Sequence, residues 1–559
     1  MSVAGAANRL YLLAAAPARL RFERGLRDPR RAQQAILARI LRENAASDYG
    51  RRFGFDRIRT IAEYQARVPL IDYDVLADDI DHITSGRDAV LTESAVRCLE
   101  PTGGSSAAAK LIPYTRPLLG EFSAATQPWV FDLLRSRPAL RRGRAYWAVT
   151  PPARHASRTS GGVPIGLEHD SDYFPAVARA LLDRVLGVPR AVSRAPDVTT
   201  CRYLTLRALL ALPDLAFISV WNPSFLTLLA HALDEHWRDL LADLGDGGLR
   251  VPLDGSLRAE LALVFGSRPR LASRLRRRFG VRPPEDLGTL WERLSLVSCW
   301  TDGHAARAVD GMRCRFPRVE IQGKGLLATE GVISIPLFDA EAPVAAVTSH
   351  FLEFLPAETA NTGTEACTVE QLAPGQTYEV VLTTSGGLYR YRLRDVVEMC
   401  GRYRQTPTLR FVGRADGASD VAGEKLTPVF VESVIDAAMR ATGVRAPFVM
   451  LAPAWHEPPR YLLFVEADVD AAERLARETE RRLRDAHHYG LCRALGQLGE
   501  VRAIAVRDGA RIYENVRAAR GQRAGAVKPV ALDLALHWER EFTTQPPNAA
   551  ASPASLTVA

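Results

Sequence analysis

A short stretch from Glu100 to Thr115, EPTGGSSAAAKLIPYT, gathers residue types that can hold phosphate groups. Glycines let backbone N–H groups approach closely, hydroxyl groups add donors, and a lysine supplies a positive charge, so such a loop can surround polyphosphate oxygens. The GxxxxGK[ST] spacing of a Walker loop is absent, which excludes that class of site. The candidate phosphate-binding residues are Thr102, Gly103, Gly104, Ser105 and Ser106, followed by Lys110. A flexible turn before a helix is the alternative interpretation of the same stretch.

Two carboxylates further along the chain could complete a nucleotide site. Glu330 follows Thr329 at the start of the apolar run GVISIPL, where a carboxylate can bind a magnesium ion shared with phosphate oxygens. Asp395 stands in GLYRYRLRDVVEMCG, where it can accept hydrogen bonds from both hydroxyls of a ribose. Each has an ordinary alternative: Glu330 as a surface carboxylate at a turn, and Asp395 in a structural ion pair with the neighbouring arginines.

Basic residues also stand next to glycine-rich stretches. Arg414 ends the strand-like run TLRFVGR, and the connector ADGASDVAGEKL that follows suits a hinge and contains Asp416 and Lys425. Lys528 lies in RGQRAGAVKPV, a glycine-rich loop from which an ammonium group can stabilise developing charge and then leave. An exposed loop lysine is the alternative for Lys528.

Length and composition indicate what must position these residues. The chain has 559 residues, too many for one ordinary core, so we expect one large domain and a smaller one. Its apolar content of 47% supports a sizeable interior. The net charge of +8 is spread over scattered arginines, which favours a solvated surface with room for an anionic ligand over a nucleic-acid binder.

The pattern of apolar residues changes near residue 319. Residues 29–46 and 175–300 show helical spacing, and we expect the second block to cover the faces of a sheet. Short apolar runs from about 319 to 414 predict strands, and a small α+β unit follows them. We therefore predict an α/β fold: a large N-terminal domain at 1–415 with sheets flanked by helices, a small mobile α+β C-terminal domain at 416–542, and a disordered tail at 543–559.

Cysteine usage and hydropathy bear on the compartment. The seven cysteines are widely spaced, with no CxxC pair and no zinc-type spacing, as expected for reduced thiols in the cytoplasm. No run of about 18 or more apolar residues occurs, so we expect no membrane span.

The order and spacing of these motifs resemble the adenylate-forming superfamily of acyl-CoA ligases, luciferases and adenylation domains. Thr102 to Lys110 matches the spacing of its TSGTTGxPK-like loop, with Gly103 in place of a serine and Ala107 in place of a glycine. Over nearly its whole length the chain more closely resembles the auxin-responsive Gretchen Hagen family of acyl acid amido synthetases. The stretches VPLIDYDVLADDI, SCWTDG, HFLEFLP and GLYRYRLRDVVEMCGRY carry this resemblance, although Arg394 stands where the family usually has glycine.

The resemblance implies both a reaction and a set of residues. The implied reaction activates a carboxylic acid with ATP as an acyl-adenylate, releases pyrophosphate, and transfers the acyl group to an amine, expected to be an amino acid, with release of AMP. Such adenylyl transfer depends mainly on positioning and charge neutralisation. The implied nucleotide-binding residues are Thr102, Gly104, Ser105, Ser106, Thr329, Glu330, Asp395, Arg414 and Lys425. The resemblance further assigns Mg²⁺ to Glu330, catalysis to Glu330 and Lys528, and the hinge to Asp416.

The acid is expected near Trp300 and Phe351, because an aromatic and apolar lining suits an aryl or alkyl carboxylate. Two other functions remain open. One is an acyl- or aryl-CoA ligase of the same superfamily, and the other is a catalytically inactive nucleotide-binding relative, which the departures at Gly103, Ala107 and Arg394 make conceivable. The expected partners are a small carboxylic acid and an amine, with neither nucleic acid nor membrane.

Overall fold

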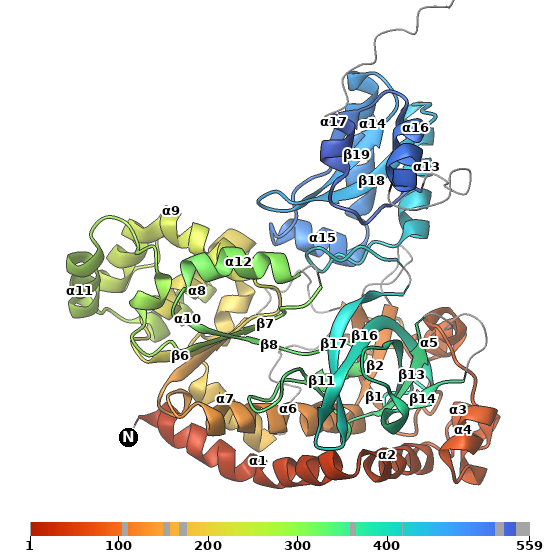
Figure 1. Cartoon of the computed structure of the whole chain (residues 1–559). Coiled ribbons are helices and arrows are strands. Elements are labelled where there is room, and N and C mark those ends of the chain that lie inside the picture. Colours follow the sequence, from red (N-terminus) through yellow and green to blue (C-terminus); the bar gives the residue numbers. More distant parts are fainter. Residues whose placement is uncertain are drawn as a thin grey trace, which may run out of the picture. The chain divides into compact units, whose positions relative to one another are not determined.

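The helices at the N-terminus form a long layer of the first unit. The computed structural model describes residues 2–102, 110–148, 157–166, 176–303, 305–357, 365–415, 417–519 and 530–543. These residues divide into two units, one from Ser2 to Ala415 and the other from Gly417 onward (Figure 1). Helix α1 (Val3–Arg27) is followed directly by α2 (Pro29–Glu43), because Asp28 ends the first and caps the second by accepting the Arg31 N–H at 3.0 Å. Helix α1 packs against α6 (Arg116–Ser136) and α7 (Ala176–Val185).

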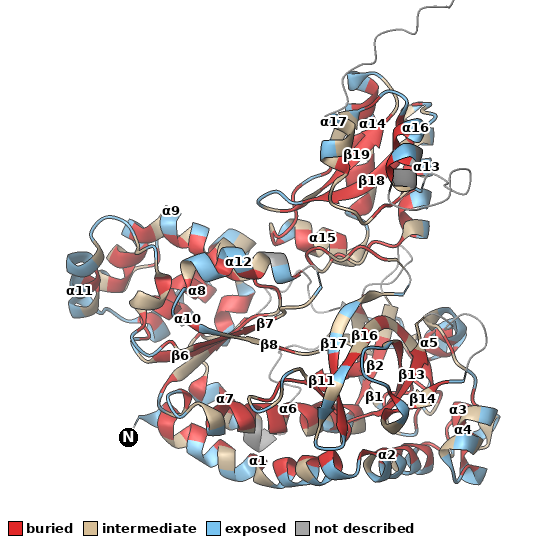
Figure 2. Cartoon of the chain, viewed as in Figure 1, coloured by how far each residue is buried: buried red, intermediate tan, exposed pale blue. Residues whose placement is uncertain are grey.

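A seven-stranded antiparallel sheet dominates this unit. Its spatial order is β11 (Ser334–Ile335), β12 (Val344–Ala345), β17 (Thr406–Arg414), β16 (Tyr391–Tyr403), β15 (Thr377–Thr383), β13 (Phe351–Pro356) and β14 (Cys367–Thr368). Strands β13 and β15 are buried along nearly their whole length, whereas buried and half-buried residues alternate through most of β16 (Figure 2). This alternation is the period of a strand with one face on the core. The strands predicted between about 319 and 414 are confirmed.

A separate four-stranded parallel sheet has the order β3 (Arg144–Trp147), β6 (Leu215–Ser219), β7 (Leu296–Cys299), β8 (Glu320–Gly323). The helices that follow one another around it are α8 (Val198–Leu210), α9 (Ser224–Asp246), α10 (Gly255–Phe265), α11 (Pro269–Phe279) and α12 (Ala305–Arg315). Helix α9 packs against α8, α11 and α12, and these helices share one core with the sheet. The block at 175–300 is mostly helical, as predicted, but β6 and β7 lie inside it, because four- or five-residue apolar runs cannot be assigned by periodicity alone.

Shorter elements complete the first unit. A four-stranded sheet has the order β2 (Lys110–Thr115), β1 (Val96–Thr102), β5 (Pro164–Ile165), β4 (Ser157–Arg158), and a two-stranded hairpin joins β9 (Leu327–Ala328) to β10 (Gly331–Val332). The short helices are α3 (Asp48–Phe53), α4 (Ile61–Arg67) and α5 (Ala77–Thr84).

The second unit is a three-stranded sheet between two layers of helices. Strand β19 (Arg460–Val465) pairs antiparallel with β18 (Val449–Ala454) and parallel with β20 (Arg502–Ala505). The helices are α13 (Pro428–Thr442), α14 (Val469–Leu483), α15 (His487–Ala494), α16 (Gly509–Ala519) and α17 (Trp538–Thr543). Leu451 and Leu463 share a core with α13 and α14, while Met450 and Phe464 share one with α16 and α17, as strand alternation requires.

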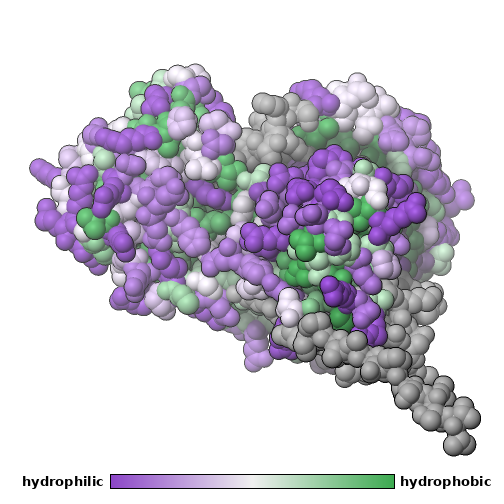
Figure 3. Space-filling view, turned by 90° about the horizontal axis from the view of Figure 1, so that it is seen from above, coloured by the Kyte–Doolittle hydropathy of each residue, from purple (hydrophilic) through white to green (hydrophobic). Residues whose placement is uncertain are grey.

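On the face seen in Figure 3, hydrophilic residues predominate and hydrophobic ones gather in small patches between them. In the described ranges, no helix has the length and apolar character needed to span a bilayer. The predicted α/β fold class, with sheets flanked by helices, is confirmed.

Candidate active site

The turn between β9 and β10 holds Thr329 and Glu330. Ala328 pairs with Gly331 across this hairpin, so Thr329 and Glu330 are its two turn residues. The Tyr114 hydroxyl donates a hydrogen bond of 2.6 Å to the Thr329 carbonyl and thereby fixes the turn against β2. Glu330 is only 6% exposed, so it is not the solvated surface carboxylate of the ordinary alternative.

Asp395 and Arg414 meet at the end of the hydrogen-bonded pair β16 and β17. They are direct partners in the strand register, and Arg414 Nη1 lies 3.0 Å from Asp395 Oδ1. Asp395 is 8% exposed. The structure therefore joins two residues that the sequence motifs presented separately, and Asp395 pairs with an arginine on the next strand.

Tyr391 responds to charges from both the strand end and the hairpin turn. Burial and then the charge of Glu330 raise the pKa of Tyr391 well above its usual value, while the charge of Arg414 acts in the opposite direction. The Tyr391 hydroxyl therefore lies within electrostatic reach of both residues. The Thr329–Glu330 turn and the Asp395–Arg414 pair thus share Tyr391 as a neighbour, and nucleotide binding by these residues remains a prediction.

Arg394 adopts a backbone conformation that favours glycine. Its φ is +66°, and its carbonyl accepts the Ala415 N–H at 2.8 Å. An L-residue in this left-handed region is strained by about 1–2 kcal/mol. Its side chain binds the Asp72 carboxylate through two hydrogen bonds, of 2.9 and 2.7 Å, which offset part of that cost. The departure from glycine therefore leaves the left-handed turn before Asp395 in place.

The arginines on either side of Tyr391 have structural partners. Arg390 Nε lies 3.2 Å from both oxygens of Glu353, which is fully buried. Burial raises the pKa of Glu353, and the charge of Arg390 counteracts this only in part. Arg392 makes two hydrogen bonds, of 2.8 and 2.7 Å, to Glu379. These pairs explain why the strand is rich in arginine without assigning those arginines to a ligand.

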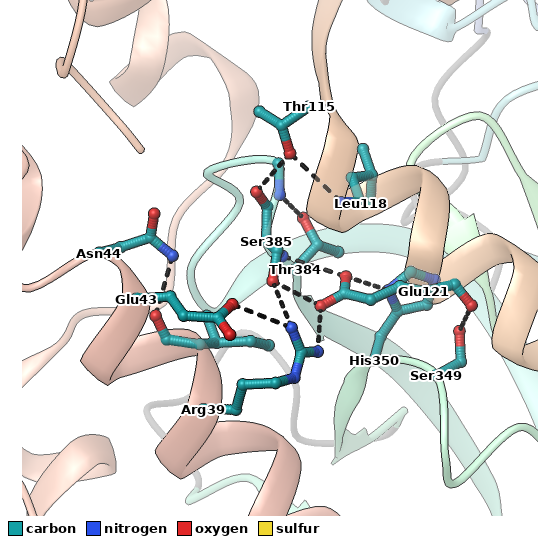
Figure 4. Close-up of polar contacts among 12 residues, drawn as sticks. Arg39, Glu43, Asn44, Thr115, Leu118, Glu121, Ser349, His350, Thr384 and Ser385 are labelled. Atoms are coloured by element: carbon teal, nitrogen blue, oxygen red, sulfur yellow. Dashed lines mark hydrogen bonds and ion pairs between the residues drawn. The ribbon is translucent and has the colours of Figure 1, made fainter. Parts of the chain in front are cut away.

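A buried carboxylate in α6 joins side chains from four segments of the chain (Figure 4). Glu121 is 3% exposed and accepts hydrogen bonds from Arg39 Nη2 at 2.6 Å, the Ser385 hydroxyl at 2.6 Å and the Ser385 N–H at 3.1 Å. His350 Nδ1 lies 3.0 Å from its second oxygen, and the Thr115 hydroxyl donates to the Ser385 carbonyl at 2.8 Å. Ser385 bonds the carboxylate and not the imidazole, so the cluster lacks the geometry of a hydrolase triad.

His350 lies between the Glu121 cluster and the Glu330 turn. A methyl group added at Gly331 would lie 2.9 Å from His350 Nε2 and 2.8 Å from Leu382 Cδ2. Only glycine fits there without displacing a neighbour, and Glu121 holds the His350 ring in place from its other side. Glu121 and His350 were not among the predicted site residues. The available signal was a charged residue in the otherwise apolar run LLGEFSAAT.

The predicted acyl-pocket residues have different surroundings. Trp300 follows β7, is half-buried, and has its ring centroid 5.8 Å from that of Trp221. Phe351 is fully buried at the start of β13, in edge contact with Tyr64 at 5.9 Å. A place in the acyl pocket remains a prediction for both residues.

The phosphate-loop prediction is only partly covered by the described ranges. Thr102 is fully buried at the end of β1 and pairs with Lys110 in the register of β1 and β2. Gly103, Gly104, Ser105, Ser106 and Ala107 lie outside the described residues, as do Asp416 and Lys528.

Lys425 lies in the connector that begins the second unit. It is half-buried with φ +49°, and the neighbouring Glu424 accepts the Val421 and Ala422 N–H groups at 2.8 and 2.7 Å and the Tyr461 hydroxyl. Burial raises the pKa of Glu424. The motif Gly-Glu-Lys thus fastens the connector onto β19 through its glutamate, next to the half-buried lysine.

Comparison with known families accounts for most of the chain. Residues 18–321 match the GH3 family N-terminal domain, residues 344–414 the GH3 family central domain, and residues 430–532 the GH3 family C-terminal domain.

Individual proteins give the same result. Indole-3-acetic acid-amido synthetase GH3.10 of Arabidopsis thaliana is 26% identical over 87% of this chain and 90% of its own length. Probable indole-3-acetic acid-amido synthetase GH3.12 of Oryza sativa is 27% identical over 75% of this chain and 74% of its own. Among solved structures, a GH3.15 acyl acid amido synthetase superposes with a TM-score of 0.63 at 20% identity, covering 93% of this chain and 94% of the other. That structural likeness shows a shared fold.

Proposed function

The chain belongs to the GH3 family, and from this membership we propose that it is an ATP-dependent acyl acid amido synthetase. It activates a carboxylic acid as an acyl-adenylate with release of pyrophosphate. The acyl group then passes to an amine, an amino acid by analogy with the jasmonoyl–L-amino acid synthetase JAR4 of Nicotiana attenuata, which is 23% identical over 82% of this chain and 82% of its own.

The observation that carries this proposal is that Glu330 and Arg414 both act on the pKa of Tyr391, while Arg414 Nη1 lies 3.0 Å from Asp395 Oδ1. In the proposed reaction Asp395 accepts hydrogen bonds from the ribose hydroxyls, and Arg414 both orients Asp395 and contacts ribose or phosphate. Thr329 lies at the α-phosphate. Because these groups are held by strand pairing and by a two-residue hairpin, they supply the fixed positioning on which adenylyl transfer depends.

The residues present fit a magnesium ion only if the nucleotide supplies most of its ligands. In the described part of the chain, no group of three or more His, Cys, Asp or Glu side chains is placed to hold a metal. Mg²⁺ ordinarily takes one or two carboxylates and completes its shell with phosphate oxygens and water. Glu330 is the proposed protein ligand, and the ion would neutralise phosphate charge.

The remaining assignments concern the second unit. We propose that residues 1–415 form the adenylation domain and 416–542 a mobile lid, with Asp416 at the hinge and a tail at 543–559. Lys528 and Lys425 would bring ammonium groups to the phosphates, and Thr102, Gly104, Ser105 and Ser106 would hold the phosphates from the first domain. The described cysteines are all free thiols, which supports a reducing compartment such as the cytoplasm.

The test uses the purified chain with a panel of acids, ATP and Mg²⁺, and either coenzyme A or a mixture of amino acids. The proposal predicts acid-dependent pyrophosphate release and amide products by mass spectrometry. Glu330→Gln should abolish pyrophosphate release, whereas Glu398→Gln, which breaks only a partly exposed pair with Arg410 on the same sheet, should not.

Two other outcomes would replace the proposal. Thioester products without amides would identify an acyl-CoA ligase. ATP binding without turnover for any acid would identify a catalytically inactive relative.

A further inference from the structure

The carboxyl edge of the parallel sheet carries a row of side chains on one face. Trp147 of β3 pairs with Ser219 of β6, Ser219 with Ser298 of β7, and Ser298 with Gln322 of β8. Because directly paired residues of a parallel sheet point to the same side, the four side chains form one line across the sheet. Ligands of open α/β sheets bind outside this edge.

Lys324 stands immediately beyond β8, at the end of this row. It is 2% exposed, and its Nζ lies 2.6 Å from the Ser219 hydroxyl. The same ammonium group lies 4.9 Å from the ring centre of Trp129 in α6 and 5.2 Å from that of Trp221. A lysine is seldom buried unless its charge has a use, since removing an ammonium group from water is costly.

Tryptophans surround the row. The Trp129 ring donates its Nε1–H to Gln322 Oε1 at 3.1 Å and meets Trp147 edge to face at 6.0 Å. Trp300 extends the group through Trp221, 5.8 Å away. Trp129 is buried, whereas the other three are half-buried and keep surface for a further contact.

Ser298 supplies an independent sign of a ligand. It is fully buried in the middle of the row, and among the described residues its hydroxyl has no hydrogen-bond partner. Buried hydroxyls are nearly always satisfied, so such a group calls for a partner that binds there. Ser298 is the strand partner of Ser219, whose hydroxyl meets Lys324, so it can donate to an anionic oxygen bound at that lysine.

The composition of the chain gives the lysine more weight. The chain has 72 basic residues but only four lysines: Lys110, Lys324, Lys425 and Lys528. The other three lie in stretches proposed to meet the nucleotide. Lys324 is the one lysine for which the proposed nucleotide site offers no role.

We propose that this tryptophan-lined row binds the acid substrate, and that Lys324 and Ser298 hold a second carboxylate on it, separate from the one that reacts. The inference rests on the proposed function and names a substrate class: acids with an apolar or aromatic body and two acidic groups. The reacting carboxylate becomes an uncharged acyl group on adenylation. A fixed buried ammonium bound to that group would lose this contact during the reaction, and it would therefore stabilise the substrate more than the transition state. A carboxylate that persists through both steps suits Lys324 better.

The test compares matched acids in pairs: benzoate with terephthalate, phenylacetate with 4-carboxyphenylacetate, and hexanoate with adipate. For each pair, kcat/KM for acid-dependent pyrophosphate release is measured in the wild-type protein, in Lys324→Met and in Lys324→Arg. In at least one pair the wild-type protein should favour the dicarboxylate by about ten- to hundredfold, the range of a charge-assisted hydrogen bond. Lys324→Met should remove that preference and Lys324→Arg should keep most of it. The ratio within a pair is independent of the fraction of protein that folds.

Other results would overturn the inference. It fails if no pair shows a dicarboxylate preference, or if Lys324→Met leaves the ratio unchanged. A separate titration without ATP, measured by tryptophan fluorescence, tests whether the same dicarboxylates bind. It also tests whether Lys324→Met weakens their binding. If binding depends on Lys324 but no acid supports pyrophosphate release, the proposed function fails and the anion site stands. If pyrophosphate release occurs but does not depend on Lys324, the proposed function stands and the anion site fails.

Discussion

Substitution of Gly331 by alanine tests how firmly the Glu330 turn is fixed. The added methyl group would lie 2.8 Å from Leu382 Cδ2 and 2.9 Å from His350 Nε2, about 0.5 Å short of ordinary contact. Leu382 can rotate away, but His350 is fully buried and held by Glu121 at 3.0 Å, so the turn itself must move. Overpacking of this kind costs about 1–3 kcal/mol of stability. A misplacement of about 1 Å costs about a hundredfold in rate, so half of that predicts about a tenfold loss.

The assay is acid-dependent pyrophosphate release, with thermal unfolding measured in parallel. Gly331→Ala should lower kcat/KM about tenfold while the protein remains folded. Adding Leu382→Ala removes the closer contact but leaves that with His350, so activity should stay low. Gly120→Ala is the matched control, because a methyl group there meets nothing within 4 Å. Full activity and unchanged stability in Gly331→Ala would refute the conclusion that His350 positions Glu330.

Three further substitutions address neighbouring groups. Asp395→Asn should raise the KM for ATP about tenfold or more. It should also lower stability by about 3 kcal/mol or less, because Arg414 loses the charge of Asp395. Unchanged ATP kinetics would exclude a role of Asp395 in nucleotide binding. The free energy of unfolding should be about 1 kcal/mol lower in Arg394→Ala than in Arg394→Gly, since both variants lose the bond to Asp72 but only alanine keeps the left-handed strain. Equal stability in a urea titration would contradict that strain. Burial alone would raise the pKa of Glu121, but hydrogen bonds and charges from its neighbours outweigh burial and hold the pKa below 4.5. The stability that ionised Glu121 contributes is therefore complete above pH 4.5 and is lost as the pH falls through the folded-state pKa. In Glu121→Gln the stability should therefore fall less steeply as the pH is lowered. An unchanged decrease at acid pH would contradict this role of Glu121.

Strand positions and the order of the motifs were predictable because both depend on local sequence. The runs that became β15, β16 and β17 show β-branched content and turn boundaries, which are properties of a few neighbouring residues. Strands β6 and β7 were missed, because each is a short apolar run inside a helical block and its parallel partners are distant in the chain.

The candidate site was predicted residue by residue but not as an arrangement. The sequence offered Asp395 several arginines, and the nearest were the expected partners of an ion pair. Strand register instead pairs it with Arg414, 19 positions away, while Arg390 and Arg392 bind glutamates on β13 and β15. Register is set by a whole sheet, so no local pattern could select among these pairs.

The sequence by itself determined the kinds of groups available, their order and the elements that hold them, because backbone preference and periodic burial act over a few residues. It also determined the family, through motifs spread along the chain. Only the tertiary structure decided which groups meet. Glu121 and His350 are 229 positions apart, and Ser219 and Lys324 are 105 apart. Such contacts come from the packing of layers. The free-energy cost of burying a charge is offset by partner groups that only the folded chain brings close.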